Sequence, residues 1–300
     1  MTDIQRVTVL GTGVLGSQIM MQAAYHGKAV TGYDISEELL AKLPDRWEWM
    51  RGYYKRDLPD FDQKRFEEAI ESIATTTDIA AAVADADIVI EAIPENLDLK
   101  RKVWSQVGGA APAKTIFTTN TSSLRPSDFA DATGRPEKFL ALHFANLVWS
   151  SNTGEVMVAE KTDPKYFDTV LEFASEIGLE PIPVRKETPG YILNSLSIPF
   201  LGAAARLYVD GVANPADIDK VWRIATGSPS GPFEDYDTVG FNVALNIIRN
   251  DKDDERLQKF GDLLEKSIDA GKAGLGDGEG FFTYDSDGNR KQPVEDWKLS

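Results

Sequence analysis

The chain of 300 residues contains no cysteine and only two histidines, His26 and His143. Without cysteine there can be no disulfide, no thiolate metal site and no thiol nucleophile. Since no second histidine lies near His143 in the sequence, metal-assisted chemistry is not expected either. The absence of cysteine fits a cytoplasmic protein, and we expect that location.

Basic residues are few compared with acidic ones. The chain has 32 lysines and arginines against 48 aspartates and glutamates, a formal net charge of −16. This charge disfavours binding to nucleic acid or to anionic membranes, whereas small anionic ligands respond more to local dipoles. No apolar run approaches the roughly 18 residues of a membrane span, so none is expected. The N-terminus, MTDIQRVTVLGTG, lacks the features of a secretory signal.

A glycine-rich motif with its full structural context opens the chain. A strand-like run ends at Leu10 and is followed by GTGVLG, a helical run that ends at Gly27, and a second strand-like run that ends in Asp34. This order within about 30 residues is typical of a dinucleotide-binding βαβ unit. The residues predicted to bind the cofactor here are Gly11, Gly13, Val14, Leu15, Gly16 and Asp34.

Each part of this motif has a physical role. Gly11 permits a tight turn, Gly13 lets the backbone approach a pyrophosphate, and Gly16 lets the helix pack closely on the strand. The free N–H groups of the helix N-terminus then face the phosphates. A carboxylate at Asp34 accepts hydrogen bonds from ribose hydroxyls and repels a 2′-phosphate, so NAD is the expected cofactor.

Residues 36–73 are expected to form a helical hairpin that breaks near residues 58–60. Aromatic and basic residues alternate in its first half. Two interpretations stay open: an arm that holds an extended anionic ligand, or a helix that packs one aromatic face and exposes its charges. The pattern favours the second.

Two further buried strands are expected at residues 87–93 and 115–119, with an amphipathic helix at 97–107 between them. The run Asn120-Thr121-Ser122-Ser123-Leu124 follows the second strand. It places small polar side chains at the carboxyl edge of a parallel sheet, where doubly wound folds bind ligands. The same run is also ordinary turn chemistry.

His143 ends a strand-like run, and Glu155 lies near the start of the next one. If these strands are neighbours, the two side chains meet. A carboxylate on one imidazole nitrogen fixes the tautomer and leaves the other nitrogen to take a hydroxyl proton. A histidine with a purely structural role fits the sequence equally well.

The second half of the chain changes character near Glu187. After a helix at 164–177 and a strand at 180–185, helical segments dominate, at about 190–210, 214–225, 236–249 and 255–270, and residues 271–300 are expected to be loop. We therefore predict an α/β Rossmann-type fold with a doubly wound, mostly parallel sheet over residues 1–187. A second, all-helical domain is expected over residues 188–300. The apolar helix after residue 190 is expected to be buried between domains or subunits.

Over nearly its whole length the chain resembles the short-chain 3-hydroxyacyl-CoA dehydrogenases, including the 3-hydroxybutyryl-CoA dehydrogenases. The motifs that match in order and spacing are GTGVLG with Asp34, EAIPENLDLK (91–100), NTSSL (120–124), HF (143–144), ETPGYILN (187–194), DID (217–219), GPFEDYDTVG (231–240) and GEGFFTY (278–284).

The resemblance implies roles for particular residues. His143 is similar to the family's catalytic base and Glu155 to its carboxylate partner. Ser122 resembles the serine that hydrogen-bonds the substrate's 3-oxygen, and Asn194 the amide that polarises it. Glu95, Lys100 and Asn120 match positions near the cofactor.

The resemblance also implies partners. It implies a homodimer formed by the helical domain, and it raises the expectation that Arg51, Lys55 or Arg56 of the helical hairpin contacts CoA. No metal is implied.

The sequence departs from the family beside the expected substrate cleft. Leu147 stands where proline usually follows Asn146, Ser195 stands where arginine is common, and Trp149 is expected to shorten a pocket. The leading hypothesis is an NAD-dependent dehydrogenase of a short-chain 3-hydroxyacyl-CoA. The alternatives are a dehydrogenase of a free 3-hydroxy acid, such as gulonate or carnitine, and a non-catalytic NAD(H)-binding protein.

Overall fold

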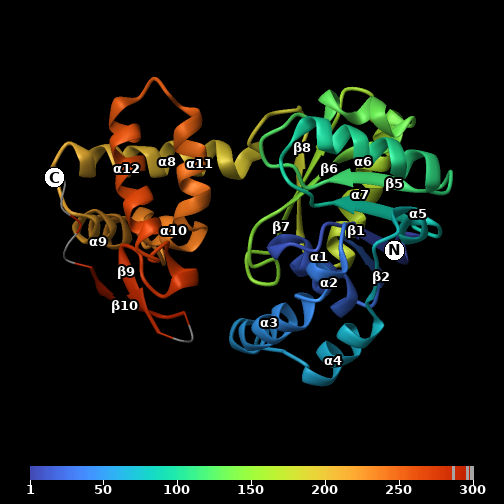
Figure 1. Ribbon diagram of the computed structural model, residues 1–300, viewed down its shortest axis with the longest axis horizontal. Helices are drawn as coiled ribbons and strands as arrows, with labels where there is room; N and C mark the ends of the chain where they lie inside the picture. The colour runs from blue at the N-terminus through green and yellow to red at the C-terminus, as the bar shows by residue number, and fades with distance from the viewer. Residues whose placement is uncertain (286–287, 295–296, 298–300) are drawn as a thin grey trace. The chain divides into compact units, whose positions relative to one another are not determined.

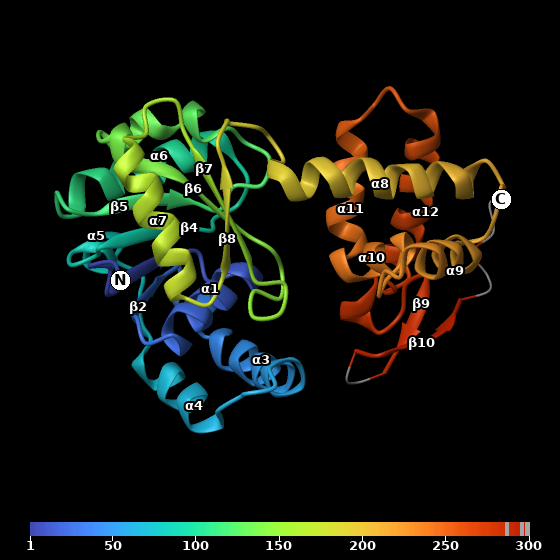
Figure 2. The same ribbon diagram turned by 180° about the vertical axis from the view of Figure 1, so that it is seen from behind.

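The computed structural model describes residues 1–285, 288–294 and 297 (Figures 1 and 2). The chain divides into two compact units, Met1–Leu193 and Asn194–Ser300. The first unit extends six residues past the boundary predicted at 187, because the first turn of the following helix bonds to the sheet.

The first unit is built on an eight-stranded sheet with the order β3-β2-β1-β4-β5-β6-β7-β8. All adjacent pairs are parallel except β6 and β7. The predicted mostly parallel, doubly wound sheet is therefore confirmed. The strands are β1 (Arg6–Leu10), β2 (Ala29–Tyr33), β3 (Ala74–Thr76), β4 (Ile88–Glu91), β5 (Ile116–Thr119), β6 (Phe139–Phe144), β7 (Thr153–Val158) and β8 (Glu180–Val184).

Helices cover both faces of this sheet, as Figures 1 and 2 show. One apolar core joins β1 to helices α1, α3, α4 and α7, and the other joins the opposite sheet face to α5 and α6. The near-continuous apolar runs of the central strands follow from this burial on both faces. The helices are α1 (Val14–Tyr25), α2 (Glu37–Leu40), α3 (Leu43–Asp57), α4 (Gln63–Ser72), α5 (Ile79–Val83), α6 (Leu97–Ala110) and α7 (Pro164–Glu176).

The second unit is mainly helical, with helices packed around an aromatic core. Its helices are α8 (Tyr191–Val209), α9 (Pro215–Thr226), α10 (Pro232–Val239), α11 (Phe241–Asn250) and α12 (Glu255–Asp269). The single helix predicted at 236–249 is in fact two, because Gly240 adopts a φ of 86° between α10 and α11.

The prediction that residues 271–300 form only loop was wrong. Strands β9 (Phe282–Tyr284) and β10 (Arg290–Pro293) form an antiparallel hairpin. The buried Asp237 carboxylate accepts hydrogen bonds from the N–H groups of Phe281 and Phe282, and both rings enter the core. A hairpin held by side chains from α10 leaves no clear local pattern in the sequence.

Two buried aspartates explain the matching motifs of this unit. Asp219 of α9 accepts the N–H groups of Phe233 and Glu234 at the start of α10. A Cβ on Gly231 would lie 2.3 Å from the Asp219 carboxyl carbon, so this position requires glycine. Burial raises the pKa of Asp219 to about 6 and that of Asp237 to about 7. These motifs therefore serve the fold of the unit.

Helix α8 is long and apolar enough to cross a membrane by length and composition, with 28% of the residues in its apolar window buried. The expectation that no run approaches a membrane span was wrong by this criterion. Leu196 of this helix is 68% exposed in the single chain, and its expected burial between domains or subunits stays a prediction. Other exposed large apolar side chains of the unit are Ile198, Leu207, Val212, Val221, Trp222, Ile224, Val239, Val243 and Ile247.

Candidate active site

The turn between β1 and α1 has the shape of a pyrophosphate cradle. Gly11 has a φ of 94°, and a Cβ there would lie 2.6 Å from the Ala92 carbonyl oxygen. A Cβ on Gly16 would lie 1.9 Å from the Gly11 oxygen, whereas a Cβ on Gly13 would meet no atom within 4 Å. Gly11 and Gly16 are thus required by close packing of the backbone, and the space above Gly13 is open to a ligand.

The helix that follows the cradle starts without a side-chain cap, since its N-cap is Gly13. Val14, its first residue, is 63% exposed, and Leu15 is partly buried against the core. Backbone N–H groups at such a helix start are donors for an anion. The motif residues therefore sit where a dinucleotide's phosphates would bind.

Asp34 follows β2 and lines a cavity of about 460 Å³ together with Gly11, Gly13 and Arg46. Its carboxylate accepts hydrogen bonds from the Thr12 N–H (2.8 Å), the Thr12 hydroxyl (2.7 Å) and the Ile35 N–H (2.8 Å). These donors fix the carboxylate against the glycine turn. An anchored carboxylate in a cavity beside an open cradle fits the adenosine ribose of NAD.

Glu95 organises the polar loop after β5. Its Oε1 accepts the N–H groups of Ser122 (3.0 Å) and Ser123 (2.9 Å), and it also accepts the Thr121 hydroxyl. Burial alone would raise the pKa of Glu95, but the nearby Lys100 charge and these hydrogen bonds lower it to about 2. Glu95 is therefore ionised at neutral pH.

Lys100 is 1% exposed. Its ammonium lies 2.5 Å from Glu91 Oε1 and 3.2 Å from Glu95 Oε2. The side chain is thus covered by protein, and any influence it has on a cofactor passes through Glu95.

His143 and Glu155 meet as the sequence suggested. Strands β6 and β7 are antiparallel neighbours with these two residues in direct register, and His143 Nδ1 lies 2.9 Å from Glu155 Oε2. The two side chains are 7% and 4% exposed. A neutral imidazole that donates from Nδ1 to this carboxylate carries its free lone pair on Nε2.

The other oxygen of Glu155 is held by helix α8. Oε1 accepts the N–H groups of Ile192 (2.8 Å) and Leu193 (3.0 Å). Burial would raise the pKa of Glu155, but hydrogen bonds from His143, Leu193 and Ile192 lower it. The carboxylate is therefore ionised, with each oxygen committed to a different partner.

Of the polar residues expected at the carboxyl edge of the sheet, Asn120 is hydrogen-bonded to the residue after His143. Asn120 follows β5, and its Oδ1 accepts the N–H of Phe144 (2.9 Å), directly after His143. Ser122 lies two residues farther along, with an exposed side chain. Asn194 directly follows Leu193 on α8 and is the first residue of the second unit.

Tyr191 is a site residue that the sequence did not reveal. Its ring stacks on the His143 imidazole, with a centroid separation of 4.4 Å and an interplanar angle of 14°. Its φ is 53°, a conformation that is unfavourable for an aromatic residue. The available signal was its place directly after Gly190 in the ETPGY motif.

The departures from the family pattern have local explanations. Leu147 has a φ of 60°, which a proline ring forbids, and its N–H donates to Gln18 Oε1 at 2.9 Å. Trp149 packs against α3, and its expected effect on a pocket stays a prediction. It is 4% exposed, its Nε1 donates to Asp57 Oδ2, and its ring packs on Tyr54 of α3.

Helix α3 follows the packed-face interpretation. Trp47, Met50 and Tyr54 are buried in the core. Arg51 pairs with Glu67, and Arg56 pairs with Asp57. Among the described residues of this helix, Arg46 and Lys55 have no ion-pair partner, so their charges are available to a ligand.

The Rossmann sheet has a glycine turn shaped for a dinucleotide and a buried His–Glu pair near the carboxyl end of β6. Together these features define a dinucleotide-dependent dehydrogenase. Residues 6–188 match the NAD-binding domain of 3-hydroxyacyl-CoA dehydrogenase, and residues 190–284 match the C-terminal domain of the same family. The chain belongs to the 3-hydroxyacyl-CoA dehydrogenase family and is an NAD-dependent oxidoreductase.

Individual relatives support this assignment. The chain is 36% identical to the human mitochondrial hydroxyacyl-coenzyme A dehydrogenase, over 94% of this chain and 91% of the relative. It is 30% identical to 3-hydroxybutyryl-CoA dehydrogenase of Clostridioides difficile, over 93% of this chain and 99% of the relative. Among solved structures, it is 52% identical to a diketoreductase described as acting on dicarbonyl compounds. That match has a TM-score of 0.88 and covers 95% of this chain and 100% of the other.

Proposed function

We propose that the protein interconverts a short-chain 3-hydroxyacyl-CoA and its 3-ketoacyl-CoA, with His143 as the general base. The observation that carries this proposal is the His143–Glu155 pair, which leaves Nε2 of a buried imidazole free to exchange a proton. A bound nicotinamide supplies or accepts the hydride. Glu155 stabilises the imidazolium that forms when His143 takes the hydroxyl proton.

Other residues hold the reacting groups in this proposal. The hydroxyl of Ser122 and the side-chain amide of Asn194 donate to the substrate's 3-oxygen, as the family resemblance implies. Glu95 fixes the Ser122 backbone through its N–H. Asp34 and the open space over Gly13 place the cofactor. Asn120 ties the end of β5 to the residue after His143.

The test is NADH oxidation with acetoacetyl-CoA, followed at 340 nm. His143→Gln is expected to lower kcat by more than a hundredfold with NADH affinity within twofold of wild type. His26→Gln is the matched control, because His26 caps α1 through the Gln22 carbonyl and lies outside the pair. Full activity of His143→Gln would refute the proposed role.

A second candidate substrate class is a dicarbonyl compound without CoA. The 52% identity to a diketoreductase favours it, and so does the pairing of Arg51 with Glu67 and of Arg56 with Asp57, because both cations are already neutralised within the protein. Parallel assays with acetoacetyl-CoA, a CoA-free dicarbonyl compound and free 3-keto acids separate the candidates. Competitive inhibition by free CoA is expected only for the CoA-dependent enzyme.

We also propose that the protein is a homodimer through the exposed apolar side chains of α8 and α9. Leu196 of α8 is 68% exposed and Val221 of α9 is 69% exposed, an arrangement that favours burial by a partner. Light scattering after gel filtration is expected to give twice the 33.0 kDa chain mass. Leu196→Asp should reduce it to the monomer mass, whereas Ile35→Asp, an equally exposed site in the first unit, should not. Flotation of the wild-type chain with liposomes would instead indicate membrane binding. The cytoplasmic location stays a prediction, which cell fractionation checks.

A further inference from the structure

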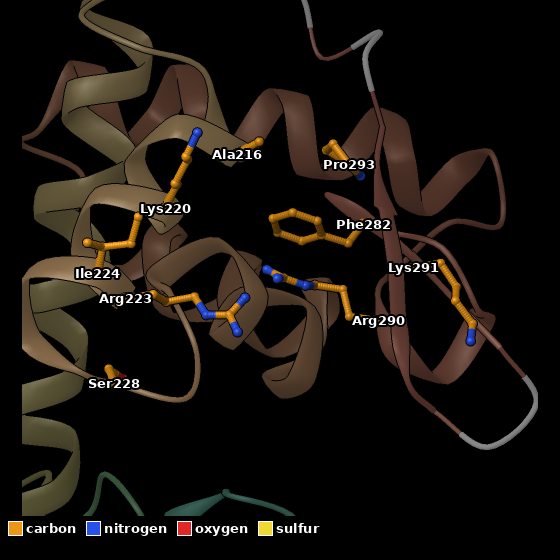
Figure 3. A pocket seen from close by; sticks show the side chains of 9 residues that line it. All are labelled: Ala216, Lys220, Arg223, Ile224, Ser228, Phe282, Arg290, Lys291 and Pro293. Atoms are coloured by element: carbon orange, nitrogen blue, oxygen red, sulfur yellow. The ribbon is translucent and has the colours of Figure 1, made fainter.

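We propose that the second unit carries a binding site for a phosphate-bearing small molecule, separate from the proposed active site. A cavity of about 480 Å³ opens between α9 and the β9–β10 hairpin. Figure 3 shows the side chains around it. Its lining residues are Ala216, Lys220, Arg223, Ile224, Ser228, Phe282, Arg290, Lys291 and Pro293.

The cavity is basic in a strongly acidic protein. Four of the nine lining residues carry positive charge and none is acidic, although the whole chain has a net charge of −16. Helix α9 places Ala216, Lys220 and Ile224 at a spacing of four residues, so they share one face of the helix. Lys220 forms no ion pair with any residue that the structure describes. A concentration of one charge sign in a concave surface focuses the field on an anion.

The centre of the site is a pair of arginines. Arg223 of α9 and Arg290 of β10 extend toward each other across the cavity in Figure 3. Both approach the same atom, Glu234 Oε2, at 3.7 Å and 3.1 Å. Both guanidinium groups can therefore reach a single oxyanion. The one carboxylate of Glu234 balances only one of their two positive charges.

The arginine pair is also held in place before a ligand binds. The Arg290 guanidinium lies over the Phe282 ring, 4.8 Å from its centroid, and Phe282 is 3% exposed. Glu234 is 18% exposed and contacts both arginines. Two planar forks fixed in this way match the tetrahedral oxygens of a phosphate better than flexible lysines do.

The other lining groups set the size of the ligand. Lys220 stands at one rim, and Lys291 points away from the arginines and pairs with Asp285 at 2.6 Å. Ile224 and Pro293 supply apolar wall. The ligand chemistry is therefore one phosphate or pyrophosphate group attached to a small organic part, such as a nucleoside.

Calorimetry with the whole protein tests the proposal. The probes are inorganic phosphate, inorganic pyrophosphate and ADP, each titrated with and without saturating NADH, because NADH fills the glycine cradle but also carries a pyrophosphate that could compete for the basic cavity. Saturable binding of pyrophosphate or ADP with a Kd below about 1 mM, weakened at least threefold by 0.3 M NaCl, is expected. Binding of ADP but not of pyrophosphate would show that the nucleoside part of the ligand contributes to the affinity and would support the site as one for a nucleotide. No saturable binding of any probe up to 5 mM would overturn the proposal.

Variants locate the site. Arg223→Gln and Lys220→Gln are expected to weaken binding at least tenfold and threefold, respectively. Arg223→Lys keeps the charge but loses the fork, and should also weaken it. The matched control is Lys259→Gln, which removes an exposed charge from α12 in the same unit. Unchanged binding in folded Lys220→Gln and Arg223→Gln proteins would place the anion elsewhere and overturn the assignment.

A separate observation carries a second inference, which rests on the proposed function: Tyr191 is a positioning residue for His143. Its ring covers one face of the imidazole, almost parallel to it, and is itself 1% exposed. Its backbone stays in the left-handed region, between Gly190 with a φ of 82° and the two N–H groups that bond Glu155. The same turn of chain therefore fixes both the ring plane of His143 and its carboxylate partner.

Removal of the ring should free the imidazole to rotate. Tyr191→Leu is expected to lower kcat by 10- to 100-fold with the KM for NADH within twofold, and Tyr191→Phe should restore activity to within threefold of wild type. Nitrogen-15 NMR of the imidazoles gives a readout that needs no substrate, since the chain has two histidines and His26→Gln assigns them. The His143 tautomer and titration should change in Tyr191→Leu and not in Tyr191→Phe. An unchanged His143 spectrum would refute the positioning role, whereas inactivity of the wild type on every keto substrate would refute only the proposed reaction.

Discussion

Substitution of Glu155 by glutamine should disable the proposed base without unfolding the protein. Glutamine has the same shape, but only one of its two terminal atoms accepts hydrogen bonds. In the native site Oε1 accepts two N–H groups of α8, and Oε2 faces His143 Nδ1 at 2.9 Å. The amide oxygen of glutamine can therefore face either α8 or His143, but not both.

We expect the amide oxygen to face the backbone N–H groups of α8. Turning the amide NH₂ toward Ile192 and Leu193 would leave two partly buried N–H groups without an acceptor, at about 1–3 kcal/mol each. The oxygen thus stays with α8, and the NH₂ donates to His143 Nδ1. The proton of a neutral imidazole is then forced onto Nε2, which can no longer take the substrate proton.

The size of the effect follows from these energies. If about 3 kcal/mol opposes the productive tautomer, its population falls roughly a hundredfold. Loss of the negative charge beside the imidazolium removes about another 1.5 kcal/mol, or tenfold. We therefore expect kcat to fall about 10³-fold in Glu155→Gln.

Steady-state kinetics and thermal unfolding together check this prediction. The melting temperature of Glu155→Gln should stay within a few degrees of wild type, because α8 keeps its acceptor. Glu155→Ala, which strips both N–H groups of that acceptor, should be much less stable. A kcat of Glu155→Gln within fivefold of wild type, or an Nδ1-protonated His143 by NMR, would refute the reasoning.

Substitutions at three further positions probe other parts of the first unit. Leu147→Gly should raise the free energy of unfolding by about 1 kcal/mol, because glycine tolerates a φ of 60°, whereas Leu147→Pro should lower it by about 3 kcal/mol or more in urea titrations. Asp34→Ala should raise the KM for NADH about tenfold and reduce the preference for NADH over NADPH. An unchanged NADH/NADPH ratio of kcat/KM would contradict the proposed contact between Asp34 and the ribose. The pKa of Glu95 in the fold, about 2, lies below the unfolded value of 4.5, so its stabilisation is present above pH 4.5 and is lost as the pH falls toward 2. Glu95→Gln should therefore lose less unfolding free energy than wild type as the pH falls from 4.5 to 2. The same pH dependence in both proteins would contradict the lowered pKa of Glu95.

The local part of the fold and site could be predicted from the sequence. The glycine turn, α1, β2 and Asp34 are contiguous, and their spacing follows from the geometry of one βαβ unit. The break between α3 and α4 and the helix ends around α6 and α7 also follow from local signals. Pairing of His143 with Glu155 was predictable only on the condition that β6 and β7 are neighbours, which the register then met.

Features that depend on distant contacts could not be predicted. The β9–β10 hairpin depends on Asp237, more than 40 residues earlier in the chain. Trp149 looked like a pocket residue from its place in the sequence, but its partners Asp57 and Tyr54 come from α3. The burial of Lys100 against Glu91 could not be predicted either, and its place near the cofactor stays a prediction.

The sequence by itself determined the class of the protein, because dinucleotide binding needs a short contiguous motif whose glycines and aspartate are set by backbone sterics. Tertiary structure alone decided how the His143–Glu155 pair is supported. Glu155 divides its two oxygens between a strand neighbour and the start of α8, and Tyr191 stacks on His143 from that same helix start. The basic cavity likewise exists only because α9 and β10, far apart in the chain, bring Arg223 and Arg290 to one carboxylate oxygen. A hydrogen bond or an ion pair acts over a few ångströms of space, whatever the separation along the chain.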